Sequence, residues 1–279
     1  MFRSGAYWYA LSTQRGMAEV PVIRSTDLVH WEDRGDALAS LPQWSRFGAV
    51  WAPSVLAVPT GFVLFYATTD ADTGLQCLSS AVAVLPDGPY VDASAGPLVC
   101  QTDRGGSIDA SPFRDADGRP WLTWKSEGTL YGEPTRLWSQ PLSDDGRRLV
   151  DAPHELLATA EAWEGPIVEA PSMVVHEGRY HLLYSGNRWE TSSYATGVAR
   201  CDGPAGPCRR SGGPPAAAHS SEAGAGGAEV FRDLDGSLRV AYHAWDPNAV
   251  GYPAGLRRLR IGALTIGADD RVSLEPLPV

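Results

Sequence analysis

Long apolar segments and long helical patterns are both missing from this sequence. No stretch approaches the roughly 18 apolar residues of a membrane-spanning helix. The first residues, MFRSGAYWYALSTQ, lack the basic and apolar regions of a signal peptide. No hydrophobic pattern with helical spacing continues beyond about two turns. We therefore expect a protein that does not enter a membrane and is not built on helices.

Positive charge is also scarce. The chain has 23 Lys and Arg residues against 33 Asp and Glu residues, which gives a formal net charge of −10 at pH 7. Proteins that bind nucleic acid need a basic surface to neutralise phosphates, so nucleic acid is not an expected partner. With 43% hydrophobic positions in 279 residues, the chain has enough apolar material for a core, which excludes disorder as the main state.

Turn residues and aromatic residues are abundant instead. The chain contains 30 Gly, 22 Pro and 10 Trp, a composition typical of short strands joined by tight turns. An aromatic or β-branched segment follows a glycine five times, at intervals of 56, 57, 60 and 58 residues; these glycines are Gly5, Gly61, Gly118, Gly178 and Gly236. In four of the five repeats another β-rich segment precedes the glycine, which predicts a hairpin.

A repeat of nearly 60 residues has room for about four short strands, which is one blade of a β-propeller. Five such repeats fill the chain, so we predict an all-β fold, a five-bladed β-propeller forming a single domain over residues 1–279. The alternative is a β-sandwich whose regular intervals agree by chance. The segments DADG at 115–118 and DLDG at 233–236 are interpreted as hairpin turns, because neither has the glutamate that closes a calcium loop.

Two carboxylates occupy corresponding places in consecutive repeats. Asp109 and Glu169 each lie nine residues before the hairpin glycine. The innermost strands of a propeller line its channel, so both side chains are expected to face the axis. Two carboxylates held apart across a pocket are the chemistry of glycosidic bond cleavage. The alternative is that the acids only satisfy strand-end amides.

Aromatic side chains that could stack on sugar rings lie in or near the loops expected around this site. These candidate substrate-binding residues are Trp51, Phe113, Trp163 and Trp189. The alternative is that they fill the gaps between blades.

The four cysteines fall into two neighbourhoods, Cys77 with Cys100 and Cys201 with Cys208. This predicts two local disulfides and an extracellular protein. Four cysteines allow three pairings, and buried free thiols in a cytoplasmic protein are the alternative.

Several ordered motifs resemble glycoside hydrolase family 43. They are WAPSV at 51–55, SIDASPFRDADGRPWLTW at 107–124 and IVEAPSMVVHEGRYHLLYSGN at 167–187. The opening GAYWYALST resembles the family's first blade, and VAYHAW at 240–245 resembles its metal-binding histidine strand. The resemblance implies a five-bladed propeller that hydrolyses α-L-arabinofuranosides, β-xylosides or arabinan with inversion. Its partner would be a carbohydrate from a plant polysaccharide, and we expect a monomer.

Individual roles follow from the same resemblance. Glu169 resembles the family's general acid, and Asp109 resembles the third carboxylate that orients this acid and raises its pKa. His243 resembles the histidine that holds a calcium ion, or its water shell, in the central channel; the alternative is a core histidine. Arg257 matches an arginine that hydrogen-bonds the sugar, although Arg258 and Arg260 lie close by.

The sequence departs from the family pattern at the general base. The family has an Asp-Pro pair on the innermost strand of the first blade, shortly before a Gly-x-Tyr-Tyr strand. Here that strand starts at Gly5, so the equivalent position falls upstream of Met1. We expect the first blade to lack its innermost strand and the base to be missing, through a start assigned too late. The alternatives are a carbohydrate-binding propeller without hydrolysis, and a purely structural scaffold.

Overall fold

The computed structural model describes residues 1–211 and 221–277. In these residues the only helices are three turns of 3-10 helix, at Thr102–Arg104, Thr129–Tyr131 and Ala162–Glu164. The remaining regular structure is strand, so the predicted all-β class is confirmed. No helix in the described ranges has the length and hydrophobicity needed to cross a bilayer.

The chain divides into two compact units. The first contains Met1–Glu133 and Gln140–Pro153, and the second contains Pro134–Ser139 and His154–Val279. Each unit has its own core and is described by itself; only strand β10 (Arg136–Pro141) is divided between them, at Gln140.

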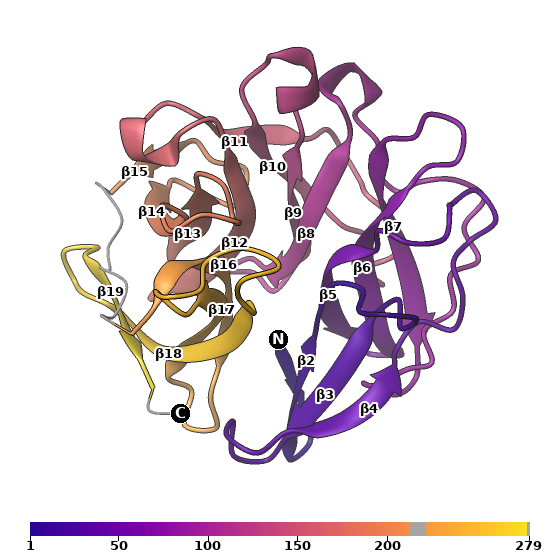
Figure 1. The fold of residues 1–279 in the computed structure, drawn as a ribbon, viewed down its shortest axis with the longest axis horizontal. Helices are drawn as coiled ribbons and strands as arrows, with labels where there is room; N and C mark the ends of the chain where they lie inside the picture. The colour runs from indigo at the N-terminus through magenta and orange to yellow at the C-terminus, as the bar shows by residue number, and fades with distance from the viewer. Residues whose placement is uncertain (212–220, 278–279) are drawn as a thin grey trace. The chain divides into compact units, whose positions relative to one another are not determined.

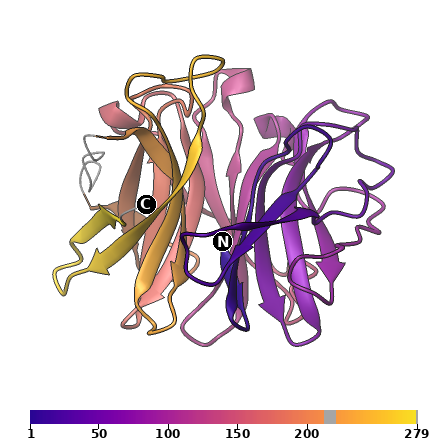
Figure 2. The ribbon, with the colours of Figure 1, turned by 60° about the horizontal axis from the view of Figure 1, so that its bottom comes forward.

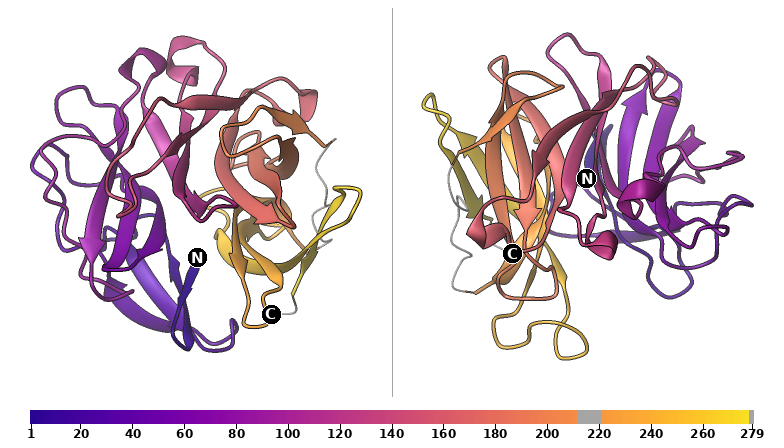
Figure 3. Two further views of the ribbon diagram at one scale, coloured as in Figure 1. Left: turned by 180° about the vertical axis from the view of Figure 1, so that it is seen from behind. Right: turned by 90° about the horizontal axis from the view of Figure 1, so that it is seen from above.

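The first unit contains two complete sheets and one hairpin (Figures 1 and 3). The first sheet has the order β1-β2-β3-β4, from the strands Phe2–Ser4, Tyr7–Leu11, Pro21–Ser25 and Glu32–Asp36. The second has the order β5-β6-β7, from Trp51–Val58, Gly61–Thr69 and Gln76–Ala83. Strands β8 (Ser107–Arg114) and β9 (Pro120–Ser126) form the hairpin, which opens the third blade.

The first sheet corrects one expectation. Strand β1 pairs antiparallel with β2, from Phe2 opposite Tyr9 to Ser4 opposite Tyr7. The first blade therefore does not lack its first strand. The strand is short, with three residues against eight in both β5 and β8.

The second unit contains two four-stranded sheets and the strand pair β10–β11 (Figures 1 and 2). Strands β10 (Arg136–Pro141) and β11 (His154–Ala158) pair antiparallel. The fourth sheet has the order β12-β13-β14-β15, from Val168–His176, Arg179–Gly186, Ala195–Cys201 and Cys208–Arg210. The fifth has the order β16-β17-β18-β19, from Ala223–Arg232, Leu238–Trp245, Arg258–Ile266 and Val272–Pro276.

The four predicted hairpins are present and a fifth forms at Gly5, so that each repeat glycine lies at the turn between the first two strands of its set. At Gly61 the reason is steric as well as conformational. Its φ is +136°, and a Cβ there would overlap the carbonyl oxygen of Ala83. Five successive sets of strands, each opened by such a hairpin, are the blades of the predicted five-bladed β-propeller.

Each unit buries a separate apolar cluster. In the first unit it includes Val20, Val22, Leu64, Tyr66, Ala81 and Tyr90. In the second it includes Leu183, Val198, Val240, Tyr242, Ala244 and Leu264. Most of these residues come from the second and third strands of a sheet, where aromatic and β-branched side chains fit the pleated surface.

A buried tyrosine hydroxyl bonded to a carboxylate recurs in three blades. The pairs are Tyr66 with Asp92 at 2.6 Å, Tyr184 with Glu164 at 2.8 Å and Tyr242 with Glu222 at 3.0 Å. Burial is the main cause that raises the pKa of each of the three phenols, so all three donate the hydrogen bond. Each pair gives a buried hydroxyl group a hydrogen-bond partner, and each tyrosine lies on the second strand of its blade.

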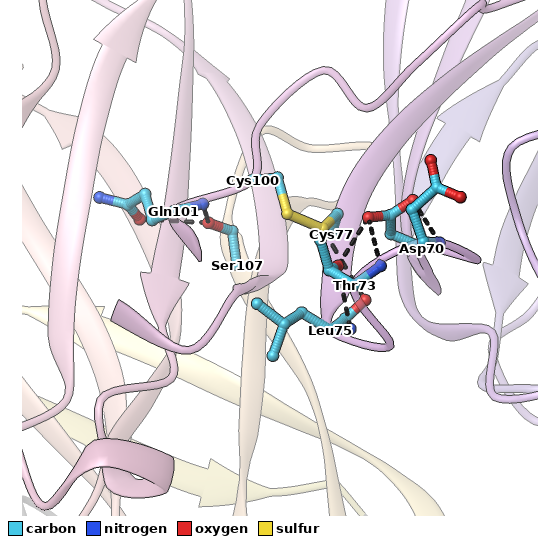
Figure 4. Close-up of a disulfide and its surroundings, with 8 residues drawn as sticks. Asp70, Thr73, Leu75, Cys77, Cys100, Gln101 and Ser107 are labelled. Atoms are coloured by element: carbon cyan, nitrogen blue, oxygen red, sulfur yellow. Dashed lines mark hydrogen bonds between the residues drawn. A yellow bond between two sulfur atoms is a disulfide. The ribbon is translucent and has the colours of Figure 1, made fainter. Parts of the chain in front are cut away.

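Both predicted disulfides are formed, Cys77–Cys100 in the first unit and Cys201–Cys208 in the second. Cys77 lies on β7, next to a turn in which the Thr73 hydroxyl donates to Asp70 at 2.6 Å (Figure 4). On the other side, the Gln101 N–H donates to the Ser107 hydroxyl at 3.1 Å (Figure 4). The bridge thus joins β7 to the segment that leads into β8.

Replacing both Cys77 and Cys100 by serine should lower the free energy of unfolding by about 3 kcal/mol, because the bridge closes a loop of 23 residues. The same change at Cys201 and Cys208 should lower it less, since that loop spans only 7 residues. Urea denaturation of the two double variants measures both values. A larger loss for the shorter loop would contradict this account.

His181 is a fully buried histidine on β13. Its Nε2 atom lies 3.6 Å from Asp270 Oδ1, and Asp270 also pairs with Arg179 at 2.8 Å and Arg200 at 3.4 Å. Burial is the main cause that lowers the pKa of His181 to about 4; Asp270 opposes this effect, and Arg200 and Arg179 add to it. His181 is therefore neutral at pH 7.

Acid should destabilise the fold through His181. Its folded pKa, about 4, lies below the ordinary value of 6.5, so the unfolded chain binds more protons between these values. Stability is therefore lost as the pH falls from 6.5 to 4, by on the order of 2 kcal/mol. Urea unfolding at several pH values should show a shallower acid loss in His181→Leu than in the wild type. Equal slopes for the two proteins would exclude this role.

Candidate active site

Four blades have a bulge at the same point of their first strand. The register shifts between Trp51 and Ser54, Ile108 and Ser111, Glu169 and Ser172, and Gly226 and Glu229. The backbone is left-handed at Ala52, Asp109, Ala170 and Gly227, with φ of 44°, 59°, 50° and 66°. A bulge sets two residues opposite one on the partner strand and redirects their side chains. Of the expected site residues, Trp51, Asp109 and Glu169 lie at these bulges.

When the blades are aligned at their bulges, Asp109 and Glu169 do not occupy equivalent positions, although each lies nine residues before its hairpin glycine. Asp109 corresponds to Ala170, whereas Glu169 corresponds to Ile108. The reason is the hairpin turn. In the third blade the Asp115 N–H donates to the Arg119 carbonyl, so three residues form the turn, whereas two form it between His176 and Arg179. Counting back from the glycine therefore introduces an offset of one residue.

Glu169 is the second residue of β12 and is 8% exposed. It lies opposite Ser185 of β13. The hydroxyl of Tyr194, which precedes β14, donates to Glu169 Oε1 at 2.8 Å, and Tyr194 is itself 3% exposed. A buried phenol therefore fixes one oxygen of this carboxyl group.

The ring of Tyr194 lies on His243 of β17. The ring centroids are 5.4 Å apart and the planes differ by 7°. Two glycines of β16 leave the room for this stack. A Cβ at Gly226 would overlap Tyr194 Cε1, and a Cβ at Gly227 would come within 2.8 Å of His243 Cδ2.

His243 is neutral at pH 7, because burial and then the charge of Arg257 lower its pKa to about 3. Arg257 Nη1 lies 3.4 Å from His243 Nε2. A guanidinium can only donate, so Nε2 is the acceptor and Nδ1 carries the proton. Among the described residues Nδ1 has no hydrogen-bond partner.

These surroundings do not fit a cation bound directly to His243 Nε2, because Arg257 brings a positive charge to the same atom. Calcium takes six to eight oxygen ligands. Within the described ranges, no three or more His, Cys, Asp and Glu side chains are grouped to hold a metal. The calcium role of His243 stays a prediction.

Arg257 continues the stack toward the surface. Its guanidinium lies 4.6 Å from the centroid of the Trp189 ring, a cation–π contact. Trp189 in turn stacks on Trp245 at 6.2 Å, and Tyr252, 59% exposed, meets both indoles at their edges. Of the three neighbouring arginines, it is therefore Arg257 that contacts the expected site residues.

The other two arginines are placed elsewhere. Arg258 is exposed, and Arg260 forms an ion pair with Glu222 at 3.0 Å. The ion pair of Arg260 does not involve Glu169 or His243.

Two of the four expected aromatic residues contact other aromatic side chains. Phe113 is 7% exposed and stacks on Trp121 near the β8–β9 turn, at the other end of β8 from Asp109. Trp163, half-buried in a 3-10 turn, lies over Gly197 and beside Tyr184, with the ring centroids 5.7 Å apart. Sugar binding by Phe113 and Trp163 stays a prediction.

Asp109 and Trp51 lie in the first unit. Asp109 is half-buried on β8, and Trp51 is 38% exposed on β5, the strand that neighbours β8. The left-handed backbone of Asp109 belongs to the bulge in β8. The first unit thus has one carboxylate and one exposed indole on two neighbouring strands.

Sequence reasoning missed Tyr194, Gly226 and Tyr252. Tyr194 and Tyr252 lie in irregular segments between strands, where no repeat or motif marks them. Gly226 belongs to a conspicuous glycine-rich stretch, and its reason is steric, because it leaves room for Tyr194.

Gly226→Ala should destabilise the protein by about 1–3 kcal/mol, because the new methyl group must displace the Tyr194 ring. Gly203→Ala is the matched control, since nothing lies within 4 Å of a Cβ at Gly203. Thermal unfolding of both variants measures the difference. A Gly226→Ala protein as stable as the control would show that the ring is not confined.

Comparisons with known proteins agree with this geometry. The family model described as glycosyl hydrolases family 43 matches residues 1–272. The β-D-galactofuranosidase xynD of Aspergillus niger is 31% identical over 195 residues, which is 66% of this chain and 53% of that protein. The extracellular endo-α-(1→5)-L-arabinanase 1 of Bacillus subtilis is 23% identical over 198 residues, 66% of this chain and 57% of that protein. The chain thus spans about half the length of the curated relatives it matches.

Solved structures match the whole chain. A crystal structure of a thermostable family-43 glycoside hydrolase has a TM-score of 0.86 and 27% identity, over 100% of this chain and 93% of that chain. An endo-1,4-β-xylanase from Bacteroides thetaiotaomicron has a TM-score of 0.82 and 27% identity, over 97% and 90% of the two chains.

Proposed function

Because the chain belongs to family 43 of the glycosyl hydrolases, we propose that it hydrolyses O-glycosidic bonds in plant polysaccharides or oligosaccharides that contain arabinose or xylose. The observation that carries this proposal is the buried Glu169 carboxyl, which Tyr194 holds beside a neutral His243 and Arg257. The named relatives and solved structures include an arabinanase and a xylanase, which supports these two sugars.

Glu169 is the general acid in this proposal. In an inverting reaction the acid gives its proton to the glycosidic oxygen as the bond to the anomeric carbon breaks. A water molecule attacks the anomeric carbon from the opposite face, and a basic carboxylate takes the proton of that water. Asp109, on β8 of the first unit, is proposed to be the third carboxylate of the family, which orients the acid.

Arg257 and Trp51 are proposed to bind the sugar, with Trp189 supporting Arg257. Arg257 presents guanidinium donors to sugar hydroxyl groups, and its stack on Trp189 fixes their direction. Trp51 offers an exposed indole on which an apolar sugar face can stack.

The second candidate function is sugar binding without hydrolysis. By the repeat count the position of the family's base falls upstream of Met1, and the three residues of β1 do not reach it. A propeller with an acid and a sugar site but no base would bind substrate and leave it intact.

We also propose an extracellular location, because disulfides persist in oxidising compartments and both bridges are formed. The relative from Bacillus subtilis is named extracellular, which agrees. The protein is proposed to act as a monomer, which its elution volume in gel filtration tests.

The test of the leading function is hydrolysis of aryl α-L-arabinofuranosides and aryl β-D-xylosides. Glu169→Gln should lower kcat/KM by about 10³-fold on a poor leaving group, and by much less on dinitrophenol, which leaves without a proton. Glu177→Gln is the control, since Glu177 is exposed at the opposite end of β12.

An equal loss on both leaving groups would contradict the role of Glu169 as acid. If the wild type turns over neither glycoside but binds the corresponding oligosaccharide in calorimetry, the binding function is supported instead.

A further inference from the structure

We propose that Tyr252 is an aromatic platform that binds a further sugar unit of an oligosaccharide, beyond the unit whose bond is cleaved. The inference rests on the proposed function and deepens it, because it concerns which substrates the same site prefers. Tyr252 lies between β17 and β18, where no motif marks it. Three features of the second unit carry the inference.

The first feature is a group of exposed apolar side chains around Tyr252. Within the described part of the second unit, the exposed large hydrophobic residues are Leu234, Tyr252, Leu256 and Leu259. Three of these four lie between residues 252 and 259. Single exposed hydrophobic residues are common on protein surfaces, whereas a group of them on one segment is typical of a binding site. Tyr252 is the aromatic member of this group.

The second feature is the contact between Tyr252 and the side chains already proposed to bind sugar. Its ring centroid lies 6.1 Å from that of Trp189 and 5.1 Å from that of Trp245, with steep angles between the planes. Trp189 also carries the Arg257 guanidinium, 4.6 Å from its centroid. Because Tyr252 is 59% exposed, these contacts leave more than half of its surface open to a ligand.

The third feature is the fixed position of this segment. The Trp245 indole N–H donates to the Trp189 carbonyl oxygen at 2.9 Å, which ties the end of β17 to the Trp189 loop. Gly251 packs against the same loop, because a Cβ there would lie 3.2 Å from the Glu190 carbonyl oxygen. The Gly255 N–H donates to the Gly251 carbonyl oxygen at 2.7 Å. The tyrosine is thus held in place before a ligand binds, which lowers the entropic cost of binding.

These features suit one class of ligand, a neutral arabino- or xylo-oligosaccharide. A sugar ring presents C–H groups on its face and hydroxyl groups at its rim. An exposed aromatic ring covers the face with little loss of side-chain freedom, and the neighbouring Arg257 donates to the hydroxyl groups. The contact path from the acid to Tyr252 runs through four side chains, the last of which are Arg257 and Trp189. Tyr252 therefore meets a sugar unit other than the one at Glu169.

Tyr252→Ala tests the platform by comparing two substrates, an aryl glycoside with one sugar and an oligosaccharide with at least three. The ratio of kcat/KM for the oligosaccharide to kcat/KM for the aryl glycoside should fall about 10-fold, mainly through KM, because stacking contributes to binding rather than to the chemical step. This ratio does not depend on how much of the protein is folded, so it separates binding from a structural role.

Two variants are the controls. Tyr252→Phe keeps the aromatic ring and should keep the ratio. Leu234→Ala removes a similarly exposed side chain from the β16–β17 turn, at the opposite end of β17 from Trp245, and should change neither the ratio nor the activity. If Tyr252→Ala leaves the ratio as it is in the wild type, Tyr252 is not a platform and the proposal is wrong.

A binding measurement separates this proposal from the proposed function. Calorimetry with arabinotriose and xylotriose, in the Glu169→Gln background, should show about 10-fold weaker binding of one of them after Tyr252→Ala. The same loss in a protein that hydrolyses neither sugar would leave the platform in place and overturn only the proposed reaction. Equal affinities with and without Tyr252, or no binding of either trisaccharide, would overturn the platform.

Discussion

The hydrogen bond between Tyr194 and Glu169 is the interaction on which the second unit's site depends. It joins a strand-end carboxylate to an aromatic stack that runs through His243 and Arg257 to Trp189. Because each member lies against the next, the direction of the carboxyl group is set by packing rather than by a single contact. The absence of side chains at Gly226 and Gly227 is what lets this stack come close to β16.

The blade repeat explains why such a site can form at this place. Every blade from the second to the fifth has a bulge in its first strand, and the residues at the bulge differ between blades. The bulge is thus a common backbone feature on which an indole, a carboxylate or a glycine can be placed. Gly226 and Gly227 of the fifth blade leave the space in which the rings of Tyr194 and His243 stack. Through Tyr194, these glycines help to position Glu169 of the fourth blade.

Several features could be predicted from the sequence because they depend on local chemistry. Hairpin glycines recur at a constant interval, so the five blades are visible in the chain itself. Both disulfides join cysteines that are close in sequence. Glu169 and Arg257 were identified through the motifs of a family, and the structure brings both into contact with the same stack.

Other features depend on relations that a linear pattern does not record. The offset between Asp109 and Glu169 arises from one extra residue in a turn. Phe113 stacks on Trp121 near the β8–β9 turn, which the motif around it does not reveal. Tyr194 bonds to Glu169 of β12 from the segment between β13 and β14, which has no repeat or motif. The short β1 pairs with β2 although the repeat count placed this strand outside the chain.

The most direct test of this account is a crystal structure of Glu169→Gln bound to an arabino- or xylo-oligosaccharide. The account predicts a glycosidic oxygen within hydrogen-bond distance of the side chain at 169, with Arg257 on a sugar hydroxyl and Tyr194 still donating to the other atom of that side chain. A sugar bound away from residue 169, or a Tyr194 hydroxyl turned away from it, would contradict the account.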